Sequence, residues 1–169
     1  LPTLWFRNTW SWGRDSRRPL ITALPARSGK PNTLIAKHWQ LGDYALYCDG
    51  ADEFLFTENE TNTERLYRVP PPTPFVKDAF HDYVVKGRRN VINPSATGTK
   101  AAAHYSRTVN AGETVAYDLR LSSLIDGHPH ESPFTDFDAI LQARLEEADE
   151  FYNVVLPERL SVDAKLGGR

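Results

Sequence analysis

Hydrophobic and polar residues alternate most regularly in the segment Thr114–Ser122, a pattern typical of a half-buried strand. The apolar members of this pattern are Val115, Tyr117, Leu119 and Leu121. The preceding segment, Thr99–Val109, is less regular, and its alanines Ala101–Ala103 indicate close packing against a neighbour. Asn110 and Gly112 lie between the two segments and tolerate positive φ angles. The pattern therefore predicts a hairpin of two long strands, which needs a larger sheet around it to be stable.

Shorter apolar runs separated by turn residues predict the other strands. They are Leu1–Asn8, Thr33–His38, Tyr44–Cys48 and Glu53–Thr57. The last three follow one another closely, which favours a meander in an antiparallel sheet. The proline-containing, basic segment Arg14–Asn32 predicts a long loop. Short strands with frequent turns indicate a mainly β fold, an antiparallel β-sandwich that is incomplete within this chain.

A helical periodicity appears near the C-terminus, across Phe134–Val155. The apolar residues with this spacing are Phe137, Ile140, Leu141, Ala148, Phe151, Tyr152 and Val155. Thr135 and Asp138 resemble a capping box in which Asp replaces the usual Glu or Gln. Pro157 cannot continue the helix. We therefore expect one long amphipathic helix after the strands.

Composition and charge narrow the classes of function. The 169 residues, 40% hydrophobic and 25% charged, fit one globular domain. The net charge of −2 provides no basic surface for nucleic acid. No apolar run approaches the roughly 20 residues that cross a bilayer, so neither nucleic acid nor a membrane is an expected partner. The chain has no methionine and begins on an apolar, strand-like run, from which we expect it to be a piece of a longer protein.

Aromatic residues crowd the first twelve positions of the chain. They are Trp5, Phe6, Trp10 and Trp12. Flat apolar rings of this kind suit the faces of pyranose sugars. The alternative is that they fill a sandwich core, where each indole N–H needs only a hydrogen-bond partner. Both interpretations remain open at the level of sequence.

The segment Glu58–Asn62 is unusually polar for a stretch that directly follows an apolar strand. Its side chains include Glu58, Asn59, Glu60 and Asn62. Such oxygens are suited to Ca²⁺ or to sugar hydroxyls, although the spacing does not match an EF-hand loop. The simpler alternative is a turn that caps a short helix near Glu64–Tyr67.

Titratable groups cluster in Phe75–Val85, which contains Lys77, Asp78, His81 and Asp82. On a helix, Asp78 and Asp82 share one face at i, i+4. Paired carboxylates perform acid–base work in glycoside hydrolysis, but these two lie too close together for a sugar ring to fit between them. Salt bridges to Lys77 or to a neighbouring arginine are the favoured interpretation. His128 and His130 lack a third ligand with zinc-site spacing, so no metal is expected.

Three sequence blocks together resemble proteins related to glycoside hydrolase family 63, the relatives of the processing α-glucosidases that trim mannosyl-oligosaccharides. The blocks are LPTLWFRNTWSWG (residues 1–13), LFTENETNTERLY (55–67) and NPSATGTKAAAHY (93–105), and the phrases PFVKDAFHDYVV and FDAILQARLEEADEFY occur in fitting order. The resemblance implies an N-terminal β-sandwich of the supersandwich type before an (α/α)6 barrel. It implies inverting hydrolysis of an α-glucosidic bond by barrel carboxylates, without metal or organic cofactor. Residues 1–126 then belong to the sandwich, and residues 127–169 to a helical linker leading to the barrel.

No barrel carboxylate has a counterpart here, so the resemblance assigns no catalytic residue. The expected function is a non-catalytic segment that packs against and shapes the catalytic barrel, with carbohydrate bound through the parent protein. The candidate substrate-facing or barrel-facing residues are Trp10, Trp12, Glu58, Asn59, Glu60, Asn62, Asp78 and His81. The alternatives are a free-standing carbohydrate-binding β-sandwich and a small hydrolase using Asp78, His81 and Asp82. We further expect the isolated piece to self-associate through its uncovered sheet edge and apolar surface.

Overall fold

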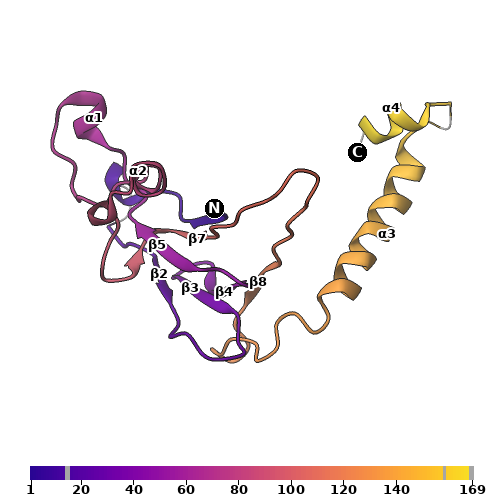
Figure 1. Cartoon of the computed structure of the whole chain (residues 1–169), viewed down its shortest axis with the longest axis horizontal. Helices are drawn as coiled ribbons and strands as arrows, with labels where there is room; N and C mark the ends of the chain where they lie inside the picture. The colour runs from indigo at the N-terminus through magenta and orange to yellow at the C-terminus, as the bar shows by residue number, and fades with distance from the viewer. Residues whose placement is uncertain (14–15, 158, 168–169) are drawn as a thin grey trace. The chain divides into compact units, whose positions relative to one another are not determined.

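The computed structural model of the chain describes residues 1–13, 16–157 and 159–167 (Figure 1). It divides into two compact units, Leu1–Glu131 and Ser132–Arg169. The first unit contains the strands, and the second contains the two C-terminal helices.

Two antiparallel sheets form the first unit. The smaller sheet has the order β1-β7-β5, with β1 at Thr3–Trp5, β7 at Lys100–His104 and β5 at Glu53–Thr57. The larger sheet has the order β6-β2-β3-β4-β8, with β6 at Thr97–Gly98, β2 at Leu20–Ala23, β3 at Asn32–His38, β4 at Gly42–Cys48 and β8 at Leu119–Ser123. Among the described strands the sheets do not close on themselves. The fold is therefore mainly β, an antiparallel β-sandwich with a C-terminal α-helix, as the sequence predicted.

The core lies between the sheets, because alternate residues of each strand point inward. Ile21, Leu34 and Ala36 of the larger sheet meet Phe56 and Ala101 of the smaller one, and all five are at most 5% exposed. A second cluster joins residues of both sheets through Cys48, Ala51 and Ala103.

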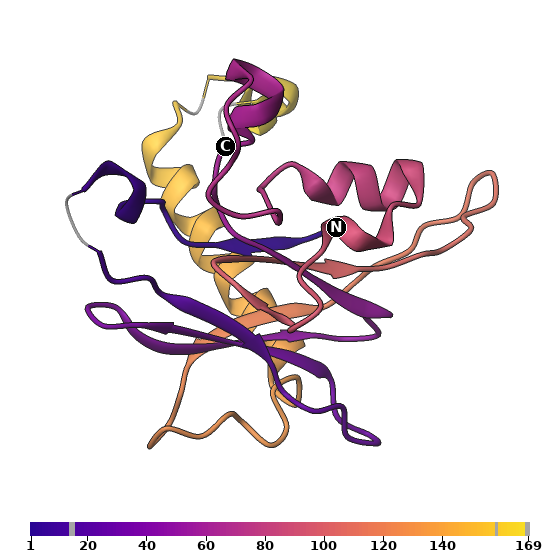
Figure 2. The same ribbon diagram turned by 90° about the vertical axis from the view of Figure 1, so that its left-hand side faces the viewer.

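The opposite face of the smaller sheet is covered by a helix. Helix α2 (Ala79–Lys86) places Phe80 against Leu55 and Ala102, on the side away from the larger sheet (Figure 2). Strand β7 is thus buried on both faces, which explains its run of three small residues, Ala101–Ala103. The close packing that the sequence indicated at this run is confirmed.

One glycine is required by the packing of the two sheets. A Cβ atom on Gly98 of β6 would lie 2.3 Å from the carbonyl oxygen of Thr57 in β5. No side chain fits at this distance, so the approach of β6 to β5 depends on glycine at that position.

The first unit also contains short helical segments. They are the 3₁₀ turns η1 (Trp10–Trp12) and η2 (Arg89–Val91) and the helix α1 (Thr63–Tyr67). Helix α1 begins at the N-cap Asn62, whose side chain accepts a hydrogen bond from the Arg65 amide. The predicted turn that caps a helix near Glu64–Tyr67 is therefore confirmed.

The second unit contains α3 (Phe137–Val155) and α4 (Val162–Gly167). Helix α3 confirms the long helix, but its N-cap is Asp136 and no side chain caps it, so the capping box predicted at Thr135 and Asp138 is wrong. None of the side chains of α3 is buried. In the described part of the chain, no helix is both long and apolar enough to cross a bilayer.

The hairpin predicted over Thr99–Ser122 is wrong. Strand β7 pairs with β1 and β5, whereas β8 pairs with β4 in the other sheet. Residues 105–118 contain no described strand and connect the two sheets. Alternation along a strand reports which face is buried, but it does not specify the partner strand.

Two other strand predictions require correction. The strands at Thr33–His38, Tyr44–Cys48 and Glu53–Thr57 are confirmed, but only β3 and β4 are neighbours. The third, β5, crosses to the smaller sheet, so the three do not form a meander. The segment Arg14–Asn32 was expected to be loop throughout, yet it contains β2, whose four residues are too few for a clear periodic signal.

Candidate functional site

A cleft of about 830 Å³ opens beside β1 and the Glu58–Asn62 loop. Its walls come from residues 5–11, from residues 59–67 and from Pro72 and Lys77. These segments lie together because Asn59 and Asn8 link the two loops. The Asn59 side-chain amide donates to the Phe6 carbonyl (2.9 Å), and the Asn8 amide donates to the Asn59 carbonyl (3.1 Å).

Glu60 is the carboxylate at the base of this cleft, and it is only 3% exposed. The Trp10 indole N–H donates to its Oε1 at 2.5 Å. The Ser11 hydroxyl (2.6 Å) and the Asn8 amide (3.0 Å) both donate to its Oε2. The Arg18 guanidinium lies 3.8 Å from Oε1. A buried carboxylate with this many donors acts as a structural clamp that holds the 8–11 loop against the 58–62 loop.

Glu58 and Asn59, the two residues before Glu60, also form hydrogen bonds with distant residues. The Thr99 hydroxyl donates to Glu58 Oε2 at 2.6 Å and accepts a hydrogen bond from the Asn59 amide at 2.8 Å. The side-chain partners of Glu58, Asn59 and Glu60 lie 40 or more positions away in the sequence, which no local pattern indicates.

Asp78 and Asp82, the candidate acid–base pair, each form ion pairs. Asp78 contacts Arg65 at 3.2 Å, and the Asn62 amide also donates to it. Asp82 contacts Lys86 at 2.7 Å and Arg88 at 3.3 Å. The hydrogen bond from Lys86 is the main cause that holds the pKa of Asp82 below its ordinary value. The salt bridges to a neighbouring arginine, favoured from sequence, are confirmed, whereas Lys77 donates to the Thr61 hydroxyl instead.

His81 does not join these carboxylates in a cleft. It is an exposed residue of α2, and its backbone amide donates to the Asp78 carbonyl at 3.2 Å. An exposed His81 and two ion-paired carboxylates give no support to the alternative of a small hydrolase that uses Asp78, His81 and Asp82.

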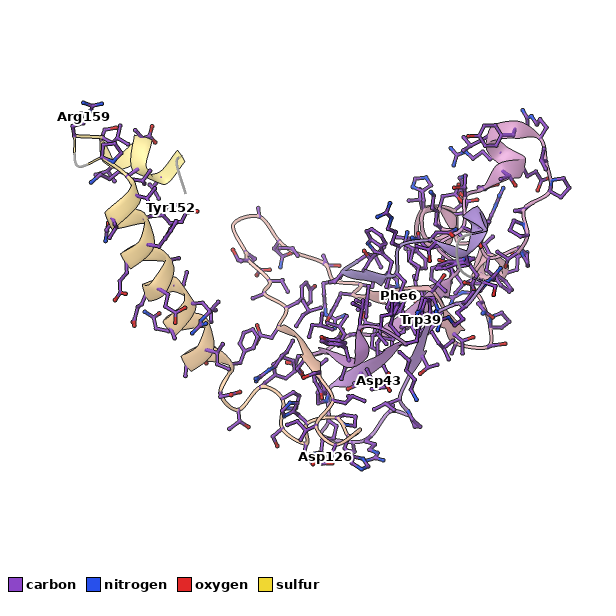
Figure 3. The ribbon with its side chains drawn as sticks, turned by 180° about the vertical axis from the view of Figure 1, so that it is seen from behind. Phe6, Trp39, Asp43, Asp126, Tyr152 and Arg159 are labelled. Carbon is purple, nitrogen blue, oxygen red and sulfur yellow. The ribbon has the colours of Figure 1, made fainter. Side chains whose placement is uncertain are left out.

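The aromatic residues of the N-terminus have separate positions. Trp10 is 7% exposed, so its ring presents almost no surface to a ligand. Trp12 belongs to η1, but its side chain lies outside the described residues. Phe6 stacks on His38 (5.4 Å between ring centroids), which stacks on Trp39 (4.1 Å) (Figure 3). Trp5, by contrast, is 54% exposed and lines the cleft.

Tyr67 is a cleft residue that the sequence pattern did not single out. It ends α1, is 68% exposed and lines the same cleft as Trp5. The available sequence signal was an aromatic residue at the end of a short helix that follows a polar segment.

A second group that sequence reasoning missed links β5, β7 and α2. His104 Nδ1 lies 2.8 Å from Glu53 Oε1, and the Tyr83 hydroxyl donates to Glu53 Oε2 at 2.9 Å. Arg89 in turn donates to the Tyr83 hydroxyl at 3.1 Å. These residues are far apart in the sequence, and the network fastens α2 to the smaller sheet.

His128 and His130 line a smaller pocket of about 360 Å³, with Arg27 and Lys30 on its wall. The His130 amide donates to the buried Tyr47 hydroxyl at 2.6 Å. Among the described residues, no group of three or more His, Cys, Asp or Glu side chains is arranged to hold a metal ion.

The 830 Å³ cleft thus combines two exposed aromatic rings with amide and hydroxyl groups and with the basic side chains of Arg7 and Lys77. Its single acidic lining residue, Glu60, is already hydrogen-bonded through both oxygens. This chemistry suits the binding of a polar ligand better than proton transfer, which needs a carboxylate that can exchange its proton with substrate.

The chain is similar to a region of a longer curated protein. It is 30% identical over 194 aligned residues to the uncharacterized protein YMR196W of Saccharomyces cerevisiae, and the alignment covers 95% of this chain and 17% of the yeast protein. The chain therefore spans about 17% of the length of that relative. No family model and no solved structure matches the chain.

Proposed function

We propose that this chain is a non-catalytic β-sandwich segment of a glycoside hydrolase that resembles the family 63 α-glucosidases. In this proposal the segment packs against and shapes a catalytic barrel, and the barrel supplies the carboxylates that hydrolyse an α-glucosidic bond with inversion. The partners are the remainder of the parent protein and, through it, carbohydrate.

The observation that carries the proposal is that the candidate carboxylates are all occupied by hydrogen bonds or ion pairs within the chain. Glu60 is a buried clamp, and Asp78 and Asp82 are tied to basic side chains. An inverting glycosidase needs two carboxyl groups about 6.5–9.5 Å apart with room for a sugar and a water. The alignment with 17% of the longer yeast protein also supports a role as one region of a larger chain.

The apolar side chains of α3 are the proposed contact with the rest of the protein. Ile140, Leu141, Leu145, Phe151 and Val155 are all more than 40% exposed. Such side chains favour association. We therefore propose that residues 1–169 self-associate when isolated, and sedimentation over a range of concentrations tests this.

An activity assay tests the main proposal. Residues 1–169 and the protein encoded by the complete gene are purified separately and supplied with an α-glucoside. We expect turnover only by the longer protein. Steady turnover by residues 1–169 that Asp78→Asn abolishes would overturn the proposal and favour the small hydrolase.

A further inference from the structure

We propose that the cleft beside β1 binds a neutral oligosaccharide, with Trp5 and Tyr67 as stacking surfaces. This deepens the proposed function and rests on it for the class of sugar, an α-linked glucan. The stacking argument itself depends only on the structure of the first unit.

The exposure of Trp5 follows from the strand in which it lies. Leu4 points into the core between the sheets, so its neighbour Trp5 points to the opposite face of the smaller sheet. On that face α2 covers Leu55 and Ala102, whereas Trp5 remains 54% exposed. A tryptophan mounted on a paired strand presents a large, rigid apolar surface at low entropic cost.

Tyr67 provides the second aromatic wall. Its helix is short but held at both ends: the Asn62 side chain caps the first turn, and the Arg68 amide bonds back to the Glu64 carbonyl at 3.1 Å. Arg68 takes a left-handed conformation, with φ of 59°, to make this bond. These bonds fix the backbone of the helix that presents Tyr67, whose side chain is 68% exposed.

The other residues that line the cleft are polar, except Pro72, and two of them, Arg7 and Lys77, are basic. Asn8, Thr9 and Thr61 line the cleft, and Lys77 donates to the Thr61 hydroxyl at 3.1 Å. Glu60 already accepts hydrogen bonds from Trp10, Asn8 and Ser11, which leaves the amide, hydroxyl and basic groups to pair with sugar hydroxyls. Apolar rings together with such polar groups match a pyranose, which has apolar faces and a polar rim. The volume of about 830 Å³ lies within the range of ligand sites, about 300–1,000 Å³.

The test is titration of residues 1–169 with maltopentaose, followed by calorimetry and by tryptophan fluorescence. We expect saturable binding, and we expect Trp5→Ala and Tyr67→Ala each to raise the Kd by about tenfold or more. Trp5→Phe should recover part of the affinity. The matched control is Tyr44→Ala, which removes an aromatic ring that is 36% exposed and does not line the cleft. Denaturant midpoints verify that each variant is folded.

Absence of saturable binding by the unmodified chain would overturn this inference, as would equal affinity in Trp5→Ala and Tyr67→Ala. The proposed function would survive either result, because it requires no sugar at this cleft. Conversely, glucoside turnover by residues 1–169 would defeat the proposed function and leave a Trp5-dependent Kd intact. The two failures are therefore distinguishable.

Discussion

The two units of this chain differ in how far their apolar side chains are exposed. In the sandwich, Phe56 and Leu55 are at most 2% exposed, and they belong to clusters that draw on both sheets or on α2. In α3, Phe151 is 59% exposed and Val154 is 87% exposed. The sandwich therefore owes its stability to burial, whereas α3 relies on its backbone hydrogen bonds and on exposed side-chain pairs.

Acidic side chains also differ in burial between the two units. Glu60 is surrounded by donors in the sandwich, while Glu147 of α3 forms an exposed i, i+3 pair with Arg144 at 2.6 Å. Exposed pairs contribute little because water and salt screen them. Removing a buried acceptor leaves its donors without partners, which costs considerably more. The same residue type thus has different consequences in the two units.

Substituting one phenylalanine in each unit tests this contrast with the largest effect. Phe56→Ala removes a ring from the core and should lower the free energy of unfolding by about 3–5 kcal/mol. Phe151→Ala should change it by no more than about 0.5 kcal/mol. Urea unfolding measures both. Comparable losses would mean that α3 contributes to a common core.

The second test compares two glutamates. Glu60→Ala leaves the donors of Trp10, Ser11 and Asn8 unsatisfied and should cost roughly 2–4 kcal/mol. Glu146→Ala, which loses only a hydrogen bond from Gln142, is the control and should cost no more than about 0.5 kcal/mol. A negligible effect of Glu60→Ala on the unfolding midpoint would refute its role as a clamp.

Glycine offers a third comparison. Gly98→Ala places a methyl group 2.3 Å from the Thr57 carbonyl oxygen and should destabilise the sandwich by about 1–3 kcal/mol. Gly167→Ala in α4 meets no atom within 4 Å and should be neutral or slightly stabilising. Thermal unfolding of both variants provides the measurement, and an unchanged midpoint for Gly98→Ala would contradict the close approach.

The smallest expected effect is a decrease in the free energy of unfolding at alkaline pH. Burial is the main cause that raises the pKa of Cys48 to about 11 from its ordinary 9.0. As pH rises, the Cys48 thiol loses its proton in the unfolded chain before it does so in the folded chain, and this favours unfolding. The free energy of unfolding is therefore unaffected by Cys48 below pH 9 and falls as pH rises from 9 toward about 11. At pH 10 the loss amounts to roughly 1 kcal/mol.

Comparing urea unfolding at pH 8 and pH 10 measures this loss. Cys48→Ala should show a smaller decrease between the two values than the unmodified chain. Part of the decrease should persist in that variant, because burial also raises the pKa of Tyr105, to about 12. Identical decreases with and without Cys48 would contradict the assignment.

The sequence by itself determined where several elements lie. The apolar runs at Thr33–His38 and Glu53–Thr57 predicted β3 and β5, and the 3.6-residue period predicted α3. These signals succeed because a strand that is covered on both faces has a continuous apolar run, and an amphipathic helix repeats its apolar residues at its own period. The small residues Ala101–Ala103 likewise indicated close packing before their neighbours were known.

Only the tertiary structure decided which elements became neighbours. The strands that were expected to form one hairpin separate into different sheets, because period-two alternation carries no information about a partner. The same holds for the cleft. Trp10 and Trp5 look equivalent in sequence, but Glu60, fifty positions from Trp10, holds that indole in the interior. Trp5 lies on the face of its sheet where α2 covers Leu55 but leaves Trp5 54% exposed. Whether an aromatic ring serves the core or a ligand depends on what the rest of the chain brings against it, and contacts between distant residues are set by packing of the whole unit.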